Sequence, residues 1–437
     1  MPSGTDNPVA RGRRAVVIGG VRTPFVKAFA EFLKLDTIAL GGAAVRGLLA
    51  RHPVPRSEID AVVWGGVILP GMSPNVGREL ALDLGLPPAV EAMTVTRACA
   101  SGLQAVTLAA AAIERGEADV VIAGGSDSTS NAEVKLPQKV VHAAAPLIYG
   151  KPTPADVLGV LAQMFPLSEA LPRVPRIAER TTGKLMGESA EEMARRNEIP
   201  RAAQDAFAVR SHQRAAAAIA SGRFAGEVVA VEAGPRWVHA DTLVRADTSV
   251  EKLAKLRPVF AADGTLTAGN SSPLTDGAAA VLLASEEKAA ALGLRPLARF
   301  ASWAYVGVDP ADQLLIGPAL AMPLALRRAG LELSDVDLVD MHEAFAAQVL
   351  SVLKVLGSDA FARLRLGRAR AVGEIDPARL NVHGGSLALG HPFAATGARM
   401  VTTMASELAT TGKRTALLGI CAAGGLGAAA VLENAAV

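Results

Sequence analysis

The chain has 437 residues, of which 50% are hydrophobic and only 4% aromatic, and its formal net charge is +2. This length and composition predict a packed globular protein of two or three lobes and exclude a disordered chain. The balanced charge, without long basic blocks, gives no support to nucleic-acid binding.

The first predicted elements are buried strands with a helix between the last two. Residues 14–20, 59–66 and 119–125 are apolar runs that end in or near glycines, as buried strands often do. Residues 103–115 are rich in alanine and contain neither proline nor glycine, which predicts a helix. Because strand, helix and strand follow one another here, we expect parallel pairing in an α/β layer.

Residues 130–255 interrupt this alternation. Prolines recur among basic residues between positions 137 and 175, and a polar helix is predicted at about 188–221. We interpret 130–255 as an inserted loop or lid domain, because long excursions of this kind often carry substrate contacts. A variable surface loop without such a role is the alternative.

The last third of the chain repeats the plan of the first. The run SEID at 57–60 returns as SDVD at 334–337, and both are followed by apolar residues. A helix predicted at 396–408 and a strand at 415–420 resemble the 103–125 unit. We therefore expect two similar halves. The first is 13–129, completed by about 256–288, and the second is 289–437.

The two cysteines, Cys99 and Cys421, are candidates for chemistry rather than for a disulfide framework. Cys99 lies in RACASG, just before the first predicted helix, where the helix terminus is expected to lower the pKa of a thiol and supply thiolate. An inert buried cysteine is the simpler alternative. Cys421 precedes AAGGLG, a loop whose N–H groups could face an oxyanion, although a tight turn would look the same.

Two histidines lie next to predicted elements of the second half. His342 follows a predicted strand, and His391 precedes the helix of the second half much as Cys99 precedes that of the first. If a pseudo-two-fold axis relates the halves, both helix N-termini face one centre. Each histidine could instead be a structural group. No histidine or cysteine pair has the spacing of known ligand motifs, so no metal site is predicted.

The segment AGNSSPLTDGAAA at 268–280 is predicted to be a close-packed loop beside a ligand, or else a plain turn into a buried strand. The N-terminal residues lack a secretory apolar stretch, and no apolar run is long enough to span a membrane. With two free thiols, these features favour a cytoplasmic protein with no transmembrane segment.

Taken in order, five motifs resemble the thiolase family. They are the Cys99 segment, GNSSPLTDGAAA, HEAF at 342–345, GGSLALGHPFAATGAR at 384–399 and CAAGGLG at 421–427. The resemblance runs from about residue 14 to 433. It implies a five-layered αβαβα fold of two similar halves plus an inserted loop domain.

The resemblance also implies roles for single residues. Cys99 matches the acyl-carrying nucleophile, His391 the base that takes its proton, and Cys421 the second acid/base. His342, where many thiolases have Asn, would hold the thioester oxygen together with His391. The backbone N–H groups of Cys99 and Ala423 would form the other oxyanion hole. The two residues matched to the pantetheine arm of coenzyme A are Ser272 and Met186.

The implied activity is that of a 3-ketoacyl-CoA thiolase in fatty-acid β-oxidation, with coenzyme A as substrate and no permanently bound cofactor. An acetyl-CoA acetyltransferase that forms acetoacetyl-CoA uses the same residues and is the alternative. A non-catalytic lipid carrier with this fold is the remaining alternative.

HEAF and GGSLALGHPF resemble the branch that holds the bacterial long-chain enzymes and the trifunctional-protein β subunit, although Ala394 replaces the family's usual Gly. That branch implies a hydratase–dehydrogenase subunit as a possible partner, and the family implies a homodimer or homotetramer.

Overall fold

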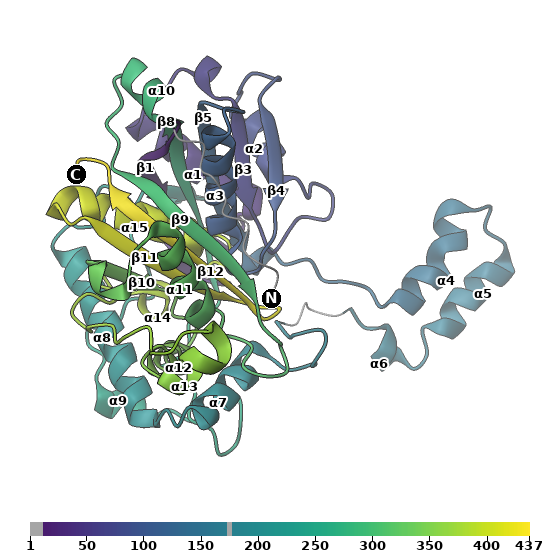
Figure 1. The fold of residues 1–437 in the computed structure, drawn as a ribbon. Coiled ribbons are helices and arrows are strands. Elements are labelled where there is room, and N and C mark those ends of the chain that lie inside the picture. Colours follow the sequence, from purple (N-terminus) through teal and green to yellow (C-terminus); the bar gives the residue numbers. More distant parts are fainter. Residues whose placement is uncertain (1–11, 173–176) are drawn as a thin grey trace. The chain divides into compact units, whose positions relative to one another are not determined.

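The computed structural model describes residues 12–172 and 177–437 (Figure 1). The chain divides into two compact units. The larger unit comprises the described residues up to Asn131 together with Ala178–Val437, and the smaller unit is Ala132–Ile177.

The first half of the larger unit is built on five neighbouring strands. Their order is β1 (Ala15–Arg22), β8 (Thr275–Ser285), β5 (Val120–Ser128), β3 (Ala61–Gly65) and β4 (Glu91–Val95). The predicted parallel pairing is confirmed, because β3 runs parallel to both β5 and β4. Strand β8 is antiparallel to β5 and β1, and the short β2 (Val26–Lys27) pairs with it.

The second half repeats this arrangement. Its order is β10 (Leu338–Met341), β11 (Thr415–Ala422), β12 (Leu426–Asn434) and β9 (Ala298–Gly307). Here β10 is parallel to β11, and β12 is antiparallel to β11 and β9, as β8 is to β5 and β1. The pairs Val16↔Arg299 and Val17↔Ala298 join the halves into one hydrogen-bonded series of strands. The predicted repeat is therefore present in the fold.

Helices complete the layers. The central helices α3 (Ser101–Glu114) and α15 (Ala395–Thr411) pack against each other and against the strands, while α1 (Thr37–Arg51) and α2 (Val76–Asp83) cover the outer face of the first half. Helices α11 (Pro318–Ala329) and α12 (Ala346–Leu356) lie on the outer side of the second half. Three hydrophobic clusters fill the spaces between these layers, which gives the order αβαβα (Figure 1). Helix α15 is buried almost all round, as a middle layer requires.

The predicted polar helix at 188–221 is two helices, α7 (Met186–Arg196) and α8 (Arg201–Ala220). Pro200 lies between them, and because proline has no N–H and restricts the residue before it, the first helix cannot continue.

The remaining elements of the larger unit are β6 (Val231–Ala233), β7 (Arg236–Val238), α9 (Val250–Ala254), α10 (Glu286–Ala291), α13 (Asp359–Phe361), α14 (Ser386–Leu389) and the short turns Arg56–Glu58, Thr129–Asn131, Leu333–Asp335 and Ala362–Leu366.

The smaller unit is a helical hairpin of α4 (Gln138–Tyr149) and α5 (Pro154–Gln163), followed by α6 (Leu167–Ala170). It is shorter than the 130–255 segment, because residues 178–255 belong to the larger unit, where α8 packs against α12 and α14. Neither α4 nor α5 has a buried residue. Among the described residues, no helix combines the length and apolar character that a membrane crossing needs.

Candidate active site

Cys99 lies in a tight turn that opens α3. Ala98 before it has a φ of +46°, a conformation that residues other than glycine rarely adopt. The Ser101 hydroxyl holds the turn: it accepts from the Arg97 N–H at 2.7 Å and donates to the Ala98 carbonyl at 2.6 Å. Strained backbone of this kind persists where surrounding structure imposes it, and it is concentrated at functional sites.

His391 is positioned by the first turn of α15 and by the end of the GNSSPLTDG loop. Its Nδ1 lies 2.6 Å from the Thr396 hydroxyl, and its backbone N–H donates to the Thr275 hydroxyl at 3.0 Å. Phe393, two residues on, has a φ of +25°, so this loop is strained as well. In the described structure Nε2 of His391 has no hydrogen-bond partner although it is buried, so it is free to serve a substrate.

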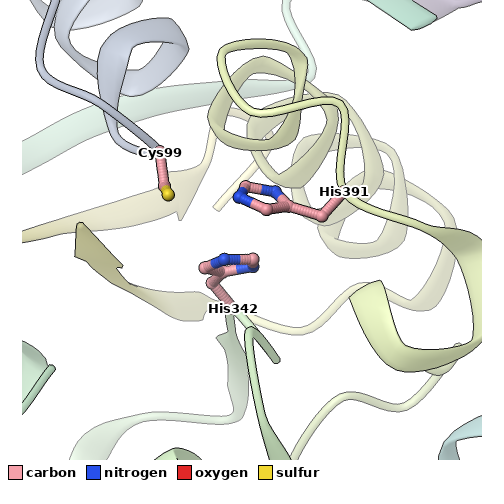
Figure 2. Close-up of side chains that lie close together, drawn as sticks. All are labelled: Cys99, His342 and His391. Carbon is pink, nitrogen blue, oxygen red and sulfur yellow. The ribbon is translucent and has the colours of Figure 1, made fainter. Parts of the chain in front are cut away.

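His342 follows β10 and faces His391. Its Nδ1 lies 2.9 Å from the Ser386 hydroxyl at the start of α14, and its Nε2 likewise has no partner among the described residues. The two imidazole rings are 4.1 Å apart between centroids and tilted by 42°. One donor atom each from Cys99, His342 and His391 lies within 4.8 Å of the others (Figure 2). The centre that was predicted from the two halves is thus assembled around these side chains.

Cys421 and Ala423 approach the same centre from the end of β11. Cys421 is buried, and this burial raises the pKa of its thiol well above the usual value, with a smaller contribution from the charge of Cys99. The backbone N–H groups of Ala423 and of Cys99 itself both interact with the Cys99 sulfur. Two amide donors therefore converge beside the nucleophile, as an oxyanion hole requires.

Burial sets the charge state of these groups. It raises the pKa of the Cys99 thiol to about 11, even though the N–H groups of Ala423 and Cys99 act in the opposite direction. The expectation that the helix terminus lowers this pKa was wrong, because desolvation of the thiolate outweighs those donors. Burial also lowers the pKa of His391 to about 3 and that of His342 well below its usual value. At rest the site holds a neutral thiol and two neutral imidazoles.

A thiol and two imidazoles within 4.8 Å of one another are also a donor set that Zn²⁺ accepts. Sequence spacing could not indicate this set, because its members come from three separate segments. The same arrangement of a thiol beside imidazoles is the one that nucleophilic catalysis by cysteine uses.

Asp127 supports the site and was missed by sequence reasoning. This buried residue of β5 accepts from the N–H groups of Val67 at 2.9 Å, Ile68 at 2.6 Å and Ala394 at 2.8 Å. It thereby fixes the His391 loop of the second half to the first half. Burial raises its pKa to about 7. A carboxylate at the end of a buried strand was the available signal.

Glu343, the acid of HEAF, is a second supporting residue. It is buried and accepts from Ser211 Oγ at 2.7 Å, Asn381 Nδ2 at 2.7 Å and the Leu387 N–H at 3.1 Å. A Cβ at Gly385 would lie 2.4 Å from this carboxylate, so only glycine fits there. Glu343 therefore anchors the segment that carries Ser386, the partner of His342.

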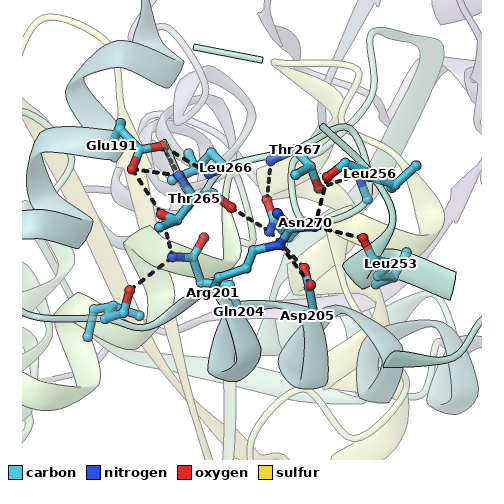
Figure 3. Close-up of polar contacts among 12 residues, drawn as sticks. Glu191, Arg201, Gln204, Asp205, Leu253, Leu256, Thr265, Leu266, Thr267 and Asn270 are labelled. Atoms are coloured by element: carbon cyan, nitrogen blue, oxygen red, sulfur yellow. Dashed lines mark hydrogen bonds and ion pairs between the residues drawn. The ribbon is translucent and has the colours of Figure 1, made fainter. Parts of the chain in front are cut away.

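Ser272 lies in a loop held by buried polar contacts (Figure 3). Asn270 donates to Asp205 of α8 at 2.9 Å and accepts from the Thr267 N–H at 2.8 Å, and Glu191 of α7 accepts from the Thr265 and Leu266 N–H groups. The Ser272 N–H donates to the Ala344 carbonyl, which ties the loop to HEAF. Met186 begins α7, so the same network connects the elements that carry both predicted arm-binding residues.

A groove opens beside this loop. It is lined by residues next to Ser272 and by two cationic side chains, and its lining includes Lys27, His212, Arg245, Ser271, Pro273 and Leu387. The two cations in this lining suit the phosphate groups of a ligand.

Comparison with known proteins gives consistent matches over nearly the whole chain. The family models for the thiolase N-terminal and C-terminal domains match residues 15–287 and 294–434. The 3-ketoacyl-CoA thiolase of Shewanella pealeana is 44% identical over 430 residues, covering 97% of this chain and 98% of the relative. That of Vibrio cholerae is 44% identical, covering 97% of each.

Solved structures agree with these matches. The Bacillus anthracis acetyl-CoA acetyltransferase superposes with a TM-score of 0.81 at 33% identity, covering 97% of this chain and 99% of that one. Human mitochondrial 3-ketoacyl-CoA thiolase in complex with CoA gives a TM-score of 0.81 at 30% identity, covering 97% and 98%.

Proposed function

Since the chain belongs to the thiolase family, we propose that it is a 3-ketoacyl-CoA thiolase, an acyltransferase that cleaves a 3-ketoacyl-CoA with coenzyme A into acyl-CoA and acetyl-CoA in fatty-acid β-oxidation. The observation that carries this function is the convergence of the Cys99 thiol with the unpartnered Nε2 atoms of His342 and His391. A nucleophile beside an acid/base group is what covalent acyl transfer needs.

In the first half-reaction Nε2 of His391 accepts the Cys99 proton, and the thiolate attacks the 3-keto carbon. The oxyanion accepts hydrogen bonds from the N–H groups of Cys99 and Ala423, and removing one such donor typically costs about 10²–10³ in rate. The bond between the 2- and 3-carbons then breaks, which leaves an acyl group on Cys99. His342 and His391 hold the thioester oxygen of the acetyl-CoA enolate, and Cys421 protonates its carbon.

In the second half-reaction the Cys421 thiolate takes the proton of the incoming coenzyme A thiol. The coenzyme A sulfur attacks the acyl carbon, and the Cys99 thiolate leaves and recovers its proton from His391. Because both thiols are neutral at rest, each proton transfer takes place only while substrate occupies the site.

We assign the pantetheine arm of coenzyme A to Ser272 and Met186, and its phosphates to the cationic side chains of Lys27 and Arg245 beside the groove. The network of Figure 3 supports this assignment, because it connects the loop of Ser272 with the helix that begins at Met186. Coenzyme A is a substrate here, and the mechanism uses no other cofactor.

An acetyl-CoA acetyltransferase is the second candidate, supported by the likeness to the Bacillus anthracis structure of that name. Both enzymes use the same residues, so the test is thiolysis of 3-ketoacyl-CoA substrates of about four to sixteen carbons with free coenzyme A. Turnover of the longer chains that Cys99→Ala lowers by at least about 10³ would support the thiolase. Turnover confined to acetoacetyl-CoA would support the acetyltransferase. Binding without turnover at any length would leave a lipid carrier.

We also propose that the protein is cytoplasmic and self-associates as a homodimer or homotetramer. Its two free cysteines support the compartment. Strand β4 is an edge of the sheet, and the exposed Met93 within it supports the self-association. Closed symmetric assemblies of this kind are common among soluble enzymes.

A hydratase–dehydrogenase subunit is the proposed second partner, and the helical hairpin 132–177 is the candidate contact. Several of its large apolar side chains are exposed, among them Ile148, Tyr149, Leu158 and Phe165. Co-expression with such a subunit tests this proposal. Replacing Leu158 and Phe165 by Gln should reduce co-purification while thiolysis persists, and unchanged co-purification would refute the contact.

A further inference from the structure

The candidate centre holds two ring nitrogens that no described residue satisfies. Nε2 of His342 and Nε2 of His391 are sealed from solvent without a hydrogen-bond partner in the described structure, and the two residues are 0% and 5% exposed. A buried polar atom without a partner lowers stability, so such atoms usually bind a ligand or take part in chemistry. The reaction scheme uses both atoms only while substrate is present. Without substrate, they remain free to bind another ligand.

The other nitrogen of each ring is held by a hydroxyl group. Nδ1 of His391 lies 2.6 Å from the Thr396 hydroxyl, and Nδ1 of His342 lies 2.9 Å from the Ser386 hydroxyl. A hydroxyl can accept a hydrogen bond as well as donate one. When both hydroxyls accept from Nδ1–H, the lone pairs of both Nε2 atoms face the centre. Metal-binding histidines have this arrangement, in which one ring nitrogen donates to a neighbour and the other holds the ion.

The third donor is the sulfur of Cys99. One donor atom from each of Cys99, His342 and His391 lies within 4.8 Å of the other two (Figure 2). On a tetrahedral zinc ion the ligand atoms lie about 3–4 Å apart, because the bonds are about 2.0–2.3 Å long. The three side chains therefore need to close by only about 1 Å to share one ion. Cys99 is partly exposed whereas both histidines are buried, so an ion reaches the centre past the sulfur.

We propose that Cys99, His342 and His391 form a Zn²⁺ site that is occupied in the absence of substrate, and that the bound ion inhibits acyl transfer. Three protein ligands with a fourth position left to water form an open zinc site. The thiol proton passes to solvent, because a thiol that coordinates zinc is deprotonated. The sulfur and the Nε2 lone pair of His391 are then both bound to the ion, so neither can act on a substrate. The inhibition rests on the proposed function, whereas the metal binding does not.

The chemistry of the three donors selects the ion. Thiolate and imidazole are ligands that Zn²⁺ prefers, whereas Mg²⁺ and Ca²⁺ take oxygen ligands. The donors are one sulfur and two ring nitrogens, without a carboxylate among them. We therefore expect Zn²⁺ to inhibit at concentrations at which Mg²⁺ has no effect.

Binding is measured first, on protein without an affinity tag and without substrate. Equilibrium dialysis with metal analysis should find one zinc ion per chain, and Co²⁺ in its place should show a sulfur-to-cobalt charge-transfer band. Cys99→Ala should abolish the band. Thr396→Val and Ser386→Ala, which remove the hydroxyl partners of the histidines, should each weaken zinc binding about 10–100-fold. Cys99→Ala and His391→Gln remove a ligand outright and should weaken it by more than about 100-fold.

His383→Gln is the matched control. His383 belongs to the same part of the chain as His391, but its Nε2 lies 2.7 Å from Glu407 Oε2 and is therefore already engaged. This variant should bind zinc as tightly as the wild type. Thermal unfolding of every variant shows that a loss of zinc binding does not come from a loss of the fold.

Inhibition of thiolysis is the second measurement. The concentration of free Zn²⁺ is fixed with a metal buffer, because the coenzyme A thiol itself binds zinc. Zn²⁺ should suppress turnover of acetoacetyl-CoA, a chelator should restore it, and a higher concentration of acetoacetyl-CoA should weaken the inhibition, since both ligands occupy one centre. The ion should also protect Cys99 from alkylation by iodoacetamide.

Three results would overturn the proposal. A wild-type chain that binds no zinc has no such site. Equal zinc affinity in the wild type and in Cys99→Ala would place the ion elsewhere. Full turnover with zinc bound would refute the inhibition. If the wild type catalyses no thiolysis, the proposed function fails, and dialysis and the Co²⁺ band alone then decide whether the three residues bind a metal.

Discussion

At Cys99 two opposing effects act on one thiol. The N–H groups of Ala423 and Cys99 favour the thiolate, and the loss of solvent favours the thiol. Loss of solvent prevails because two amide donors replace only part of a hydration shell. The same balance leaves His391 neutral. Cys99 and His391 therefore form no ion pair before substrate binds. The proton moves from the thiol to the imidazole when substrate arrives.

This resting state predicts a particular pH dependence of alkylation. Because the pKa of Cys99 is about 11, its thiolate fraction, and with it the rate of reaction with iodoacetamide, should rise about tenfold per pH unit from pH 7 to 10. The sign follows from a raised pKa, which moves the titration to higher pH. Mass spectrometry of the Cys99 peptide measures the rate, with Cys99→Ala as background. A rate that levels off near pH 7 would show a thiolate at rest.

Replacing Asp127 should weaken the contact between the two halves of the fold. Its carboxylate accepts at both oxygens, and an amide can accept at only one, so Asp127→Asn leaves the Ala394 N–H or the Val67 and Ile68 N–H groups facing a donor. We expect the free energy of unfolding to fall by about 1–3 kcal/mol and kcat to fall as well. Thermal unfolding and thiolysis measure the two effects. Asp263→Asn is the control, since that carboxylate is 84% exposed. If both variants are equally stable, Asp127 does not hold the two halves together.

At the scale of elements, the active site depends on how closely α3 and α15 approach. A Cβ on Gly102 would lie 2.0 Å from the Ala394 carbonyl, and one on Gly397 would lie 2.4 Å from the Leu103 nitrogen. The two helix N-termini are in backbone contact there. This contact places Cys99 and His391, each a few residues before its helix, on either side of one point.

Gly102→Ala should therefore damage both fold and activity. The added methyl forces the helices apart, which lowers the free energy of unfolding by about 1–3 kcal/mol or more. A shift of about 1 Å at the catalytic centre lowers the rate about 10²-fold. Gly159→Ala is the matched control, because a Cβ there meets nothing within 4 Å and alanine favours its helix α5. Thermal unfolding and kcat report the two effects. A Gly102→Ala enzyme with normal kcat would contradict the proposed geometry.

Much of the element order could be predicted from the sequence, because β3, α3 and β5 have strong apolar patterns and recur in β10, α15 and β11. The site residues of the motifs were predictable for a similar reason, since glycines and small residues mark them. The partners of the histidines were not. Ser386 reaches His342, and Asp127 reaches the loop of His391 through Ala394, only by tertiary packing, and no spacing encodes that. The pKa of Cys99 was expected to be lowered and is raised, because the depth of burial is not visible in a sequence.

At the scale of the whole molecule, strand β4 is an edge of the sheet. Strand β4 ends the strand order of the first half and has no further strand beside it among the described residues. Its Met93 is 40% exposed, and Leu82 on the adjoining α2 is 49% exposed. An unpaired edge with apolar side chains attracts another strand unless it is blocked. A second copy of the chain would offer the same edge, and antiparallel pairing of β4 with β4 would create a closed two-fold dimer.

This arrangement predicts the effect of one charge. Met93→Lys should convert the assembly to smaller species, because lysine on an edge strand opposes pairing and a two-fold axis brings both copies of the charge together. The fold should survive, since the side chain is already exposed. Light scattering after size exclusion gives the mass. Leu364→Lys is the control, an apolar residue 82% exposed in the other half of the fold. A wild-type monomer, or a dimer that tolerates Met93→Lys but not Leu364→Lys, would place the interface elsewhere.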